Sequence, residues 1–225
     1  MEIISGIHKI DGVRGANCYL VTSGPEMLLI DCGMRGSSRK LADYMQGLGK
    51  NPSDIKYIFI THADIDHAGG AAEIKQLTGA KLVIHQAEAG VMTGKEKGKQ
   101  VKGLLGLLFK LLAPVVRLKT VDPDIAIREN TELAGFKIIH TPGHTAGSIC
   151  LFQPGSVLFA GDALKSDQAG NPLPPSKMMA ADIVQAKTSV GIIAALDFDI
   201  LLVGHGAPVK GKASQKVKEM LNNWQ

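Results

Sequence analysis

Short hydrophobic runs alternate with segments of helical spacing along the chain. The runs have the length of strands and end in loops that contain glycine, and amphipathic helical patterns follow several of these loops. In the first half this pattern predicts strands at 2–10, 17–22, 26–31, 56–60 and 81–85, and helices at 38–47 and 70–78. In the second half it predicts strands at 131–140, 148–152, 156–160 and 199–203, and helices at 181–195 and 213–223. The alternation indicates an α/β fold in which helices cover sheets.

The stretch THADIDHAGG, from Thr61 to Gly70, directly follows the predicted strand at 56–60. Within six residues it carries four side chains that can ligate a metal, namely His62, Asp64, Asp66 and His67. Imidazole and carboxylate together suit a divalent ion such as zinc, iron or manganese. We expect Gly69 and Gly70 to let the backbone turn tightly into the next helix.

Three further residues have a similar local setting. His144, Asp162 and His205 each lie in a Gly- or Pro-containing loop after an apolar run. Any one of them alone is typical of a surface, turn or capping residue. Together with the loop at 61–70 they indicate one metal site, because open α/β sheets gather ligands in the loops at their strand ends. The other histidines, His8, His85 and His140, are expected to pack or to support the site.

These motifs, together with Asp31 in LLIDCG, match in order the five signature loops of the metallo-β-lactamase-fold hydrolases, and the chain resembles this family over nearly its whole length. The resemblance implies a four-layer αββα sandwich and a single domain over residues 1–225. It also implies two divalent ions. The first is held by His62, position 64 and His144, the second by Asp66, His67 and His205, with Asp162 bridging them.

One position departs from the family pattern. The family loop usually reads His-x-His-x-Asp-His, whereas here Asp64 takes the place of the second histidine. A carboxylate adds negative charge, which favours iron or manganese over zinc, and the flavodiiron branch of the same superfamily carries a glutamate here and binds iron. Two alternatives stay open. Asp64 is too short to reach the ion and only supports the site, or the first site is weak and a single ion binds.

Asp31 has two interpretations. By resemblance it lies behind the ligands, where a carboxylate accepts the spare N–H of a ligating imidazole and fixes its tautomer. The alternative is an aspartate at a strand end that caps the turn at Gly33.

The positive charge of the chain is concentrated in one segment. Of the formal net charge of +4, residues 95–119 contribute +6, from seven basic residues and one acid, and the rest of the chain contributes −2. Because the basic residues are not spread over a face, we expect no nucleic-acid binding. We predict that this segment is a basic, leucine-rich helical insertion. Its part at 101–116 has four interpretations: a lid that lines an acyl-binding groove, a homodimer contact, a membrane-surface helix or a core-packed helix. We favour lid or dimer contact and expect no membrane contact.

Cysteine use and the N-terminus predict a cytoplasmic protein. Cys18, Cys32 and Cys150 are widely spaced and odd in number, which is typical of buried thiols in a reducing compartment. The N-terminal stretch MEIISGIHKI lacks the pattern of a signal peptide.

The predicted site indicates hydrolysis of an ester, thioester or lactone in a small, acyl-containing substrate. A divalent ion lowers the pKa of bound water from 15.7 to about 7, which gives hydroxide at neutral pH, and polarises the carbonyl that it attacks. Asp66 is expected to orient this water. One rival is a mononuclear iron oxidoreductase resembling the persulfide dioxygenases, with His62, His144 and Asp162 as its triad. The other is a non-catalytic metal-binding or interaction protein.

Overall fold

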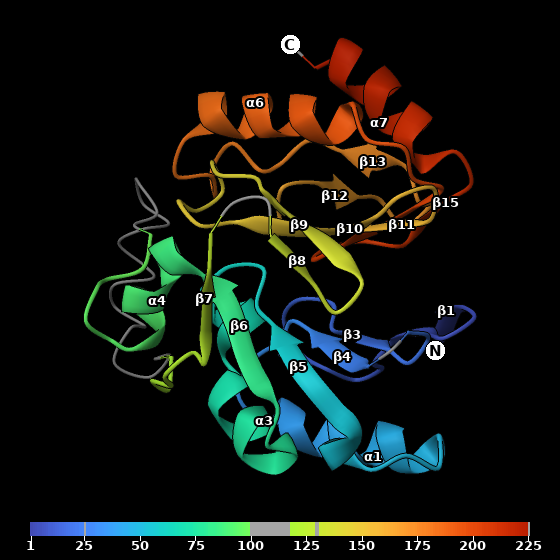
Figure 1. The fold of residues 1–225 in the computed structure, drawn as a ribbon. Coiled ribbons are helices and arrows are strands. Elements are labelled where there is room, and N and C mark those ends of the chain that lie inside the picture. The colour runs from blue at the N-terminus through green and yellow to red at the C-terminus, as the bar shows by residue number, and fades with distance from the viewer. Residues whose placement is uncertain (25, 100–117, 129–130, 225) are drawn as a thin grey trace. The chain divides into compact units, whose positions relative to one another are not determined.

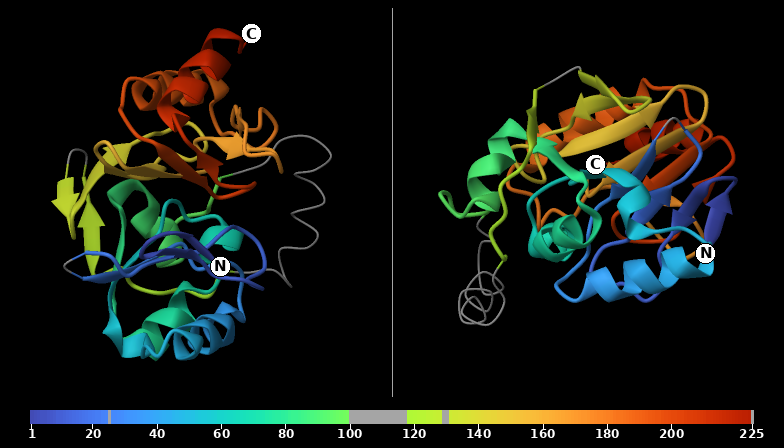
Figure 2. Two further views of the ribbon diagram at one scale, coloured as in Figure 1. Left: turned by 90° about the vertical axis from the view of Figure 1, so that its right-hand side faces the viewer. Right: turned by 60° about the horizontal axis from the view of Figure 1, so that its bottom comes forward.

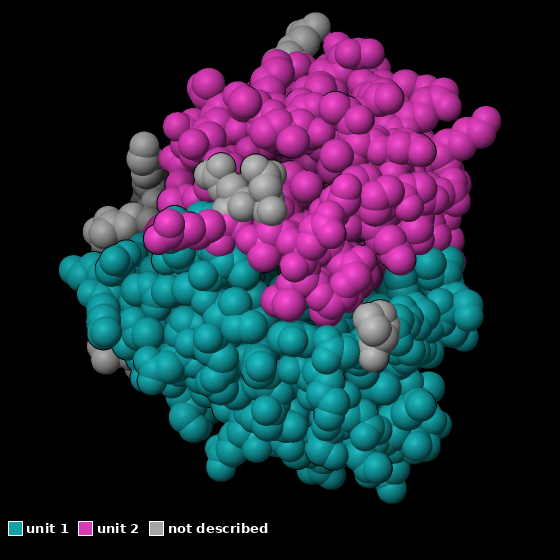
Figure 3. Space-filling view, viewed as in Figure 1, with its two compact units in different colours: residues 1–98, 110–127 teal, residues 99–109, 128–225 magenta. Residues whose placement is uncertain are grey.

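The structure is a computed structural model that describes residues 1–24, 26–99, 118–128 and 131–224. The chain forms two compact units, residues 1–98 with 110–127 (unit 1) and residues 99–109 with 128–225 (unit 2) (Figure 3). That the two units form one domain stays a prediction. The segment at 101–116, with the lid, dimer and membrane interpretations, lies outside the described residues.

Unit 1 is built on a seven-stranded sheet whose strands follow the order of the sequence (Figure 1). The strands are β1 (Glu2–Ile4), β2 (Ile7–Lys9), β3 (Tyr19–Val21), β4 (Met27–Ile30), β5 (Ile55–Phe59), β6 (Lys81–His85) and β7 (Ile125–Ile127). Strands β1 to β4 pair antiparallel, and β4 to β7 pair parallel. Because parallel strands end at the same edge, the loops after β4, β5 and β6 leave the sheet together.

Two helices cover one face of this sheet, α1 (Ser37–Gly47) and α3 (Ala71–Thr78) (Figures 1 and 2). Leu29, Ile58 and Leu82 are register partners on neighbouring strands and share one hydrophobic cluster with Leu41 of α1 and Ile74 of α3. Burial of each such side chain contributes about 1.5–3 kcal/mol. This packing fixes the strands whose ends carry the loops. Short elements complete the unit: 3-10 helix η1 (Pro52–Asp54), α2 (Ile65–Ala68) and α4 (Gln86–Met92).

Unit 2 contains a six-stranded sheet in the order β15-β14-β11-β10-β9-β8. Its strands are β8 (Thr131–Leu133), β9 (Phe136–His140), β10 (Ile149–Gln153), β11 (Val157–Gly161), β14 (Ile200–Val203) and β15 (Val209–Lys210), and a separate pair is formed by β12 (Lys165–Ser166) and β13 (Pro172–Leu173). Strands β11 and β14 run parallel, and β10 runs antiparallel to both β9 and β11. The ends of β9, β11 and β14 therefore share one edge of the sheet.

Helices α6 (Ile183–Ala194) and α7 (Ala213–Asn222) cover this second sheet (Figure 1). Val190 and Ile193 of α6 and Val217 of α7 lie in one hydrophobic cluster with Leu158 and Leu201, which are register partners on β11 and β14. None of the helices in the described ranges has the length and apolar character needed to span a bilayer.

The structure confirms the predicted strands and helices in outline and corrects three details. The predicted strands at 2–10 and 131–140 are each two strands joined by a tight turn, at Gly6 (φ 74°) and at Ala134 and Gly135 (φ 53° and 84°). Gly69 and Gly70 keep helical backbone angles, with φ −59° and −85°. They are required instead for close packing, since a side chain on Gly70 would come within 2.5 Å of the carbonyl oxygen of Cys32.

Candidate metal centre

The loop after β5 contains a short helix, and two of the four predicted ligands lie on it. Asp64 occupies the N-cap position of α2, which carries Asp66 and His67. Backbone hydrogen bonds anchor this helix: Cys32 N–H donates to the carbonyl of His67 (2.7 Å), and Ala16 N–H donates to the carbonyl of Asp66 (3.0 Å). The ligands in unit 1 are thus fixed by the loops that follow β2 and β4.

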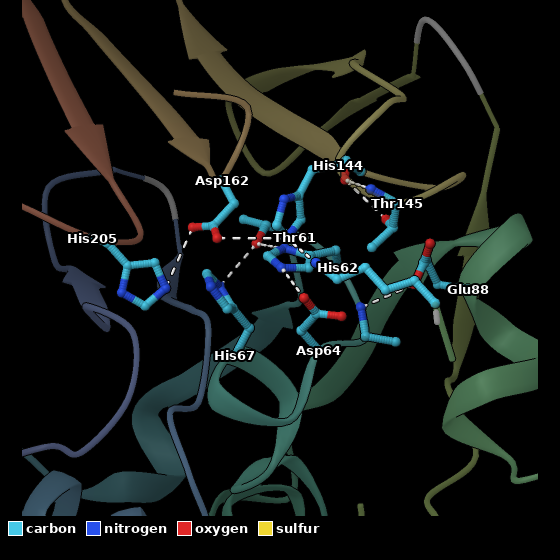
Figure 4. Close-up of polar contacts among 12 residues, drawn as sticks. Thr61, His62, Asp64, His67, Glu88, His144, Thr145, Asp162 and His205 are labelled. Carbon is cyan, nitrogen blue, oxygen red and sulfur yellow. Dashed lines mark hydrogen bonds and ion pairs between the residues drawn. The ribbon is translucent and has the colours of Figure 1, made fainter. Parts of the chain in front are cut away.

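Within unit 1 the donor atoms have the spacing of ligands that share an ion (Figure 4). Asp64 Oδ2 lies 3.4 Å from His62 Nε2. Two ligands at about 2.0–2.2 Å from one tetrahedral ion are about 3.4 Å apart. Asp64 is therefore long enough to bind the same ion as His62, which favours a direct ligand over a supporting residue. The donor atoms of His62 and His67, and those of Asp66 and His67, also lie within 4.8 Å of each other.

Asp31 holds the imidazole of His67 from behind. It is buried at the end of β4 with φ 59°, and its Oδ2 lies 2.8 Å from His67 Nδ1. A carboxylate accepts from Nδ1–H, so the ring presents Nε2 to a metal. These contacts fit the first interpretation of Asp31, as the partner of a ligating histidine.

Thr61 is part of the same network, and the sequence analysis missed it. Its backbone N–H donates to Asp31 Oδ1 (2.8 Å), and its hydroxyl lies 2.9 Å from Asp31 Oδ2 and 3.1 Å from His62 Nδ1. Thr61 thereby couples the two imidazoles to one carboxylate. A threonine between a buried strand and a histidine is a signal that could have identified it, because a buried hydroxyl needs a partner.

Glu88 is a second residue that the sequence analysis missed. It lies in the first turn of α4, is 4% exposed, and its Oε2 accepts a hydrogen bond of 3.0 Å from the backbone N–H of Ala63 (Figure 4). Ala63 stands between His62 and Asp64. Glu88 therefore holds the backbone that sets the spacing of these two donors.

In unit 2, Asp162 divides its two oxygens between two histidines (Figure 4). Asp162 follows β11, His205 follows β14, and His144 lies in the loop between β9 and β10. Oδ2 is 3.5 Å from His144 Nε2, and Oδ1 is 3.5 Å from His205 Nε2. One oxygen beside each imidazole is the arrangement expected of a carboxylate that bridges two ions. The Lys99 ammonium lies 2.5 Å from His144 Nε2, the atom with which this predicted ligand would bind a metal.

Helix α6 holds the His144 loop in place. Two backbone N–H groups at its start donate to this loop, Ala181 to the carbonyl of His144 (3.1 Å) and Asp182 to that of Gly143 (2.9 Å). Ser189 Oγ donates to the carbonyl of Pro142 (2.6 Å). Gly143 has φ 130°, and a side chain on it would collide with the backbone of Ala186. The loop and the helix are therefore packed backbone against backbone.

The donor chemistry of both units fits a borderline or hard divalent ion. Each unit supplies imidazole and carboxylate groups at ligand spacing, a set that suits zinc, iron or manganese.

The cysteines are poor candidates for metal ligands, because burial raises the pKa of Cys18 and Cys32, and the Asp31 carboxylate adds to this rise. Burial also raises the pKa of Cys150 to about 12. His8 and His85 are buried and His140 is half-buried. His8 Nδ1 lies 3.2 Å from the hydroxyl of Tyr44, and His85 Nδ1 accepts from Ala87 N–H.

An α/β chain with His and Asp in the loops at matching strand ends is typical of a metal-binding protein whose ligands come from several loops. The chain belongs to the metallo-β-lactamase superfamily, whose family model matches residues 11–205. It is 30% identical over 233 residues to the probable metallo-hydrolase YflN of Bacillus subtilis, covering 94% of this chain and 88% of that protein. It is 29% identical over 205 residues to the probable metallo-hydrolase MJ0888 of Methanocaldococcus jannaschii, covering 89% and 92%.

Solved structures confirm the predicted metallo-β-lactamase fold. A metallo-β-lactamase with a HARLDQ motif from Cronobacter sakazakii has a TM-score of 0.73 at 21% identity, covering 98% of this chain and 93% of that chain. BJP-1, a subclass B3 metallo-β-lactamase of Bradyrhizobium japonicum, has a TM-score of 0.71 at 23% identity, covering 99% and 90%. LRA-12, a class B3 di-zinc metallo-β-lactamase from an Alaskan soil metagenome, has a TM-score of 0.70 at 20% identity, covering 99% and 89%.

Proposed function

We propose that the chain is a binuclear metallo-hydrolase that cleaves an ester, thioester or lactone bond in a small acyl-containing molecule. Membership of the superfamily and two relatives described as probable metallo-hydrolases support a hydrolase. The proposed ligands are those that the motif order assigns, namely His62, Asp64, His144, Asp66, His67, His205 and the bridging Asp162. The observation that carries the binuclear proposal is the division of the Asp162 oxygens between His144 and His205.

In this proposal each acidic residue has its own task. Divalent ions, when bound, lower the pKa of a water ligand to about 7 and polarise the carbonyl of the substrate. Asp66 orients the attacking water by accepting a hydrogen bond from it. Asp31 accepts a hydrogen bond from His67 Nδ1–H over 2.8 Å, which leaves Nε2 of the same ring without a proton and able to bind a metal. Asp162 lies beside His144 with one oxygen and beside His205 with the other, and so fixes the spacing of these two histidines.

Asp64 determines which metal is preferred. Its carboxylate, 3.4 Å from His62 Nε2, brings negative charge to the first site where the family usually has a neutral imidazole. Carboxylates favour harder ions, so we propose iron or manganese above zinc at this site. Asp64→His should shift the preference toward zinc, measured by elemental analysis after equilibration with equal concentrations of zinc, manganese and ferrous ions.

The test combines metal content with turnover. Metal-free protein is reloaded with each ion, the bound ions are counted, and a panel of esters, thioesters and lactones is assayed. We expect two ions per chain and turnover of at least one substrate class. His144→Ala should lose metal and activity, whereas His8→Gln, which replaces a buried histidine that is not a proposed ligand, should retain both.

Other outcomes overturn the proposal in distinct ways. One iron per chain, with oxygen consumption on glutathione persulfide, identifies the mononuclear oxidoreductase. Bound metal without turnover of any substrate identifies a metal-binding protein. Equal metal content in the His144→Ala variant and the unmodified protein shows that the ligand assignment is wrong.

A further inference from the structure

The outer surface of α6 is unusually apolar for a helix exposed to solvent. Its twelve residues, IVQAKTSVGIIA, include one charged side chain, Lys187. Val184, Thr188 and Ile192 lie four residues apart and therefore on one face, and Val184 is 75% and Ile192 46% exposed. Surface helices usually carry charged residues on this face, and exposed apolar patches often mark binding sites.

Part of this apolar surface forms a groove where α6 and α7 pack against each other. The groove has a volume of about 510 Å³, which is in the range of sites for small molecules. Its lining belongs to unit 2 and consists of Lys177, Ile183, Val184, Lys187, Thr188, Leu221 and Trp224. Most of these side chains offer apolar surface, so the groove suits a ligand with a hydrocarbon part.

The charged side chains that line the groove are all positive. Its lining contains two lysines and no acidic residue. The carboxylate of Asp182, just before the helix, accepts from the N–H groups of Val184 and Gln185 as the N-cap. Lys187 Nζ donates to the carbonyl of Trp224 (2.8 Å) and lies 5.4 Å from the centre of its ring. An ammonium group has three donors, so Lys187 can also bind an anionic head group.

We propose that this groove binds the anion of an aliphatic carboxylic acid. The hydrocarbon chain covers Val184, Leu221 and Trp224, and the carboxylate pairs with Lys177 and Lys187. A second copy of the chain fits less well, because a symmetric contact would bring the lysines of both copies together. The proposal concerns a site separate from the metal ligands and stands independently of the reaction that the chain performs.

Trp224 makes the proposal directly measurable, because it is the sole tryptophan of the sequence. The full chain is titrated with decanoate, decanol and decyltrimethylammonium below their aggregation concentrations, and tryptophan fluorescence is followed. We expect saturable binding of decanoate that is at least tenfold tighter than that of the other two ligands. In the series octanoate, decanoate and dodecanoate, affinity should rise by up to about fourfold per added methylene group.

Variants separate the charge from the apolar surface, and each retains Trp224. The double variant Lys177→Met with Lys187→Met should lose at least tenfold in decanoate affinity while decanol binding stays within twofold. Val184→Asn, which replaces an apolar side chain by a neutral polar one, should weaken all three ligands. Lys218→Met changes an exposed lysine on α7 outside the groove and should bind decanoate like the unmodified chain.

Three results overturn the proposal. Decanoate and decanol of equal affinity show that the lysines do not select an anion, and a loss of affinity in Lys218→Met equal to that of the double variant shows a general charge effect. A fluorescence change that depends on protein concentration, with dimers detected by light scattering, shows that a second copy occupies the groove.

Discussion

Replacement of Asp31 by asparagine isolates the support that a buried carboxylate gives to a proposed metal ligand. The variant keeps the size of the side chain but removes the negative acceptor that lies 2.8 Å from His67 Nδ1. It also suits the backbone, because Asn tolerates the left-handed conformation that Asp31 adopts at φ 59°. Alanine is a poorer choice, since it would add about 1–2 kcal/mol of backbone strain at the same position.

The size of the effect follows from the geometry. A hydrogen bond to a charged group contributes about 1.5–3 kcal/mol. Loss of the carboxylate behind a ligating histidine typically weakens metal binding about 10- to 100-fold, which equals about 1.4–2.7 kcal/mol. The two estimates agree. The physical cause of the loss is that an amide N–H facing Nδ1 forces the imidazole proton onto Nε2, the atom that is proposed to bind metal. The backbone hydrogen bond from Thr61 can persist on the remaining carbonyl oxygen, so metal-free protein should lose less stability than metal affinity.

The assay is competition for zinc and manganese against a chromophoric chelator, with thermal unfolding of the metal-free protein alongside. Asp43→Asn is the matched control, because it removes the same charge from an exposed position on α1. We expect a 10- to 100-fold rise in Kd for Asp31→Asn and none for the control. A Kd within twofold of the original, accompanied by a lower Tm, would refute the reasoning and assign Asp31 a purely structural role.

Three further predictions follow from individual contacts. Glu88→Gln replaces the anionic acceptor of Ala63 N–H with a neutral one and should weaken metal binding by up to about tenfold. Chelator competition checks this, and an unchanged Kd would show that the backbone needs no such anchor. Gly143→Ala meets the backbone of Ala186 at a residue with φ 130° and should lower the free energy of unfolding by about 1–3 kcal/mol in denaturant titrations. Because burial raises the pKa of Cys150 to about 12, its thiol should stay protonated and resist iodoacetamide at pH 8 until the chain unfolds; rapid native alkylation, detected by mass spectrometry, would contradict this.

The sequence predicts best where the chemistry is local. His62, Asp64, Asp66 and His67 are neighbours in the sequence, so their clustering after β5 needs no knowledge of the tertiary structure. The hairpin at one end of each sheet is harder to predict, because the two turns, at Gly6 and at Ala134 and Gly135, lack the Asn-Gly or Asp-Gly pattern of common hairpins.

The supporting residues are harder still to predict, because their roles depend on contacts across the sequence. Glu88 acts on a backbone N–H 25 residues away, and Thr61 joins Asp31 over a separation of 30 residues. Each resembles an ordinary polar residue in its own segment. Their roles emerge from the parallel order of β4, β5 and β6, which brings three consecutive strand ends to one edge.

The attachment of the His144 loop to α6 matters for protein engineering. Pro142, Gly143 and His144 are hydrogen-bonded through their carbonyls to residues 181–189, so this loop and the helix form one cassette. A loop transplanted from another superfamily member without its own helix would lose these anchors and place its histidine poorly. Chimaeras intended to change substrate range should therefore exchange residues 141–194 as a block.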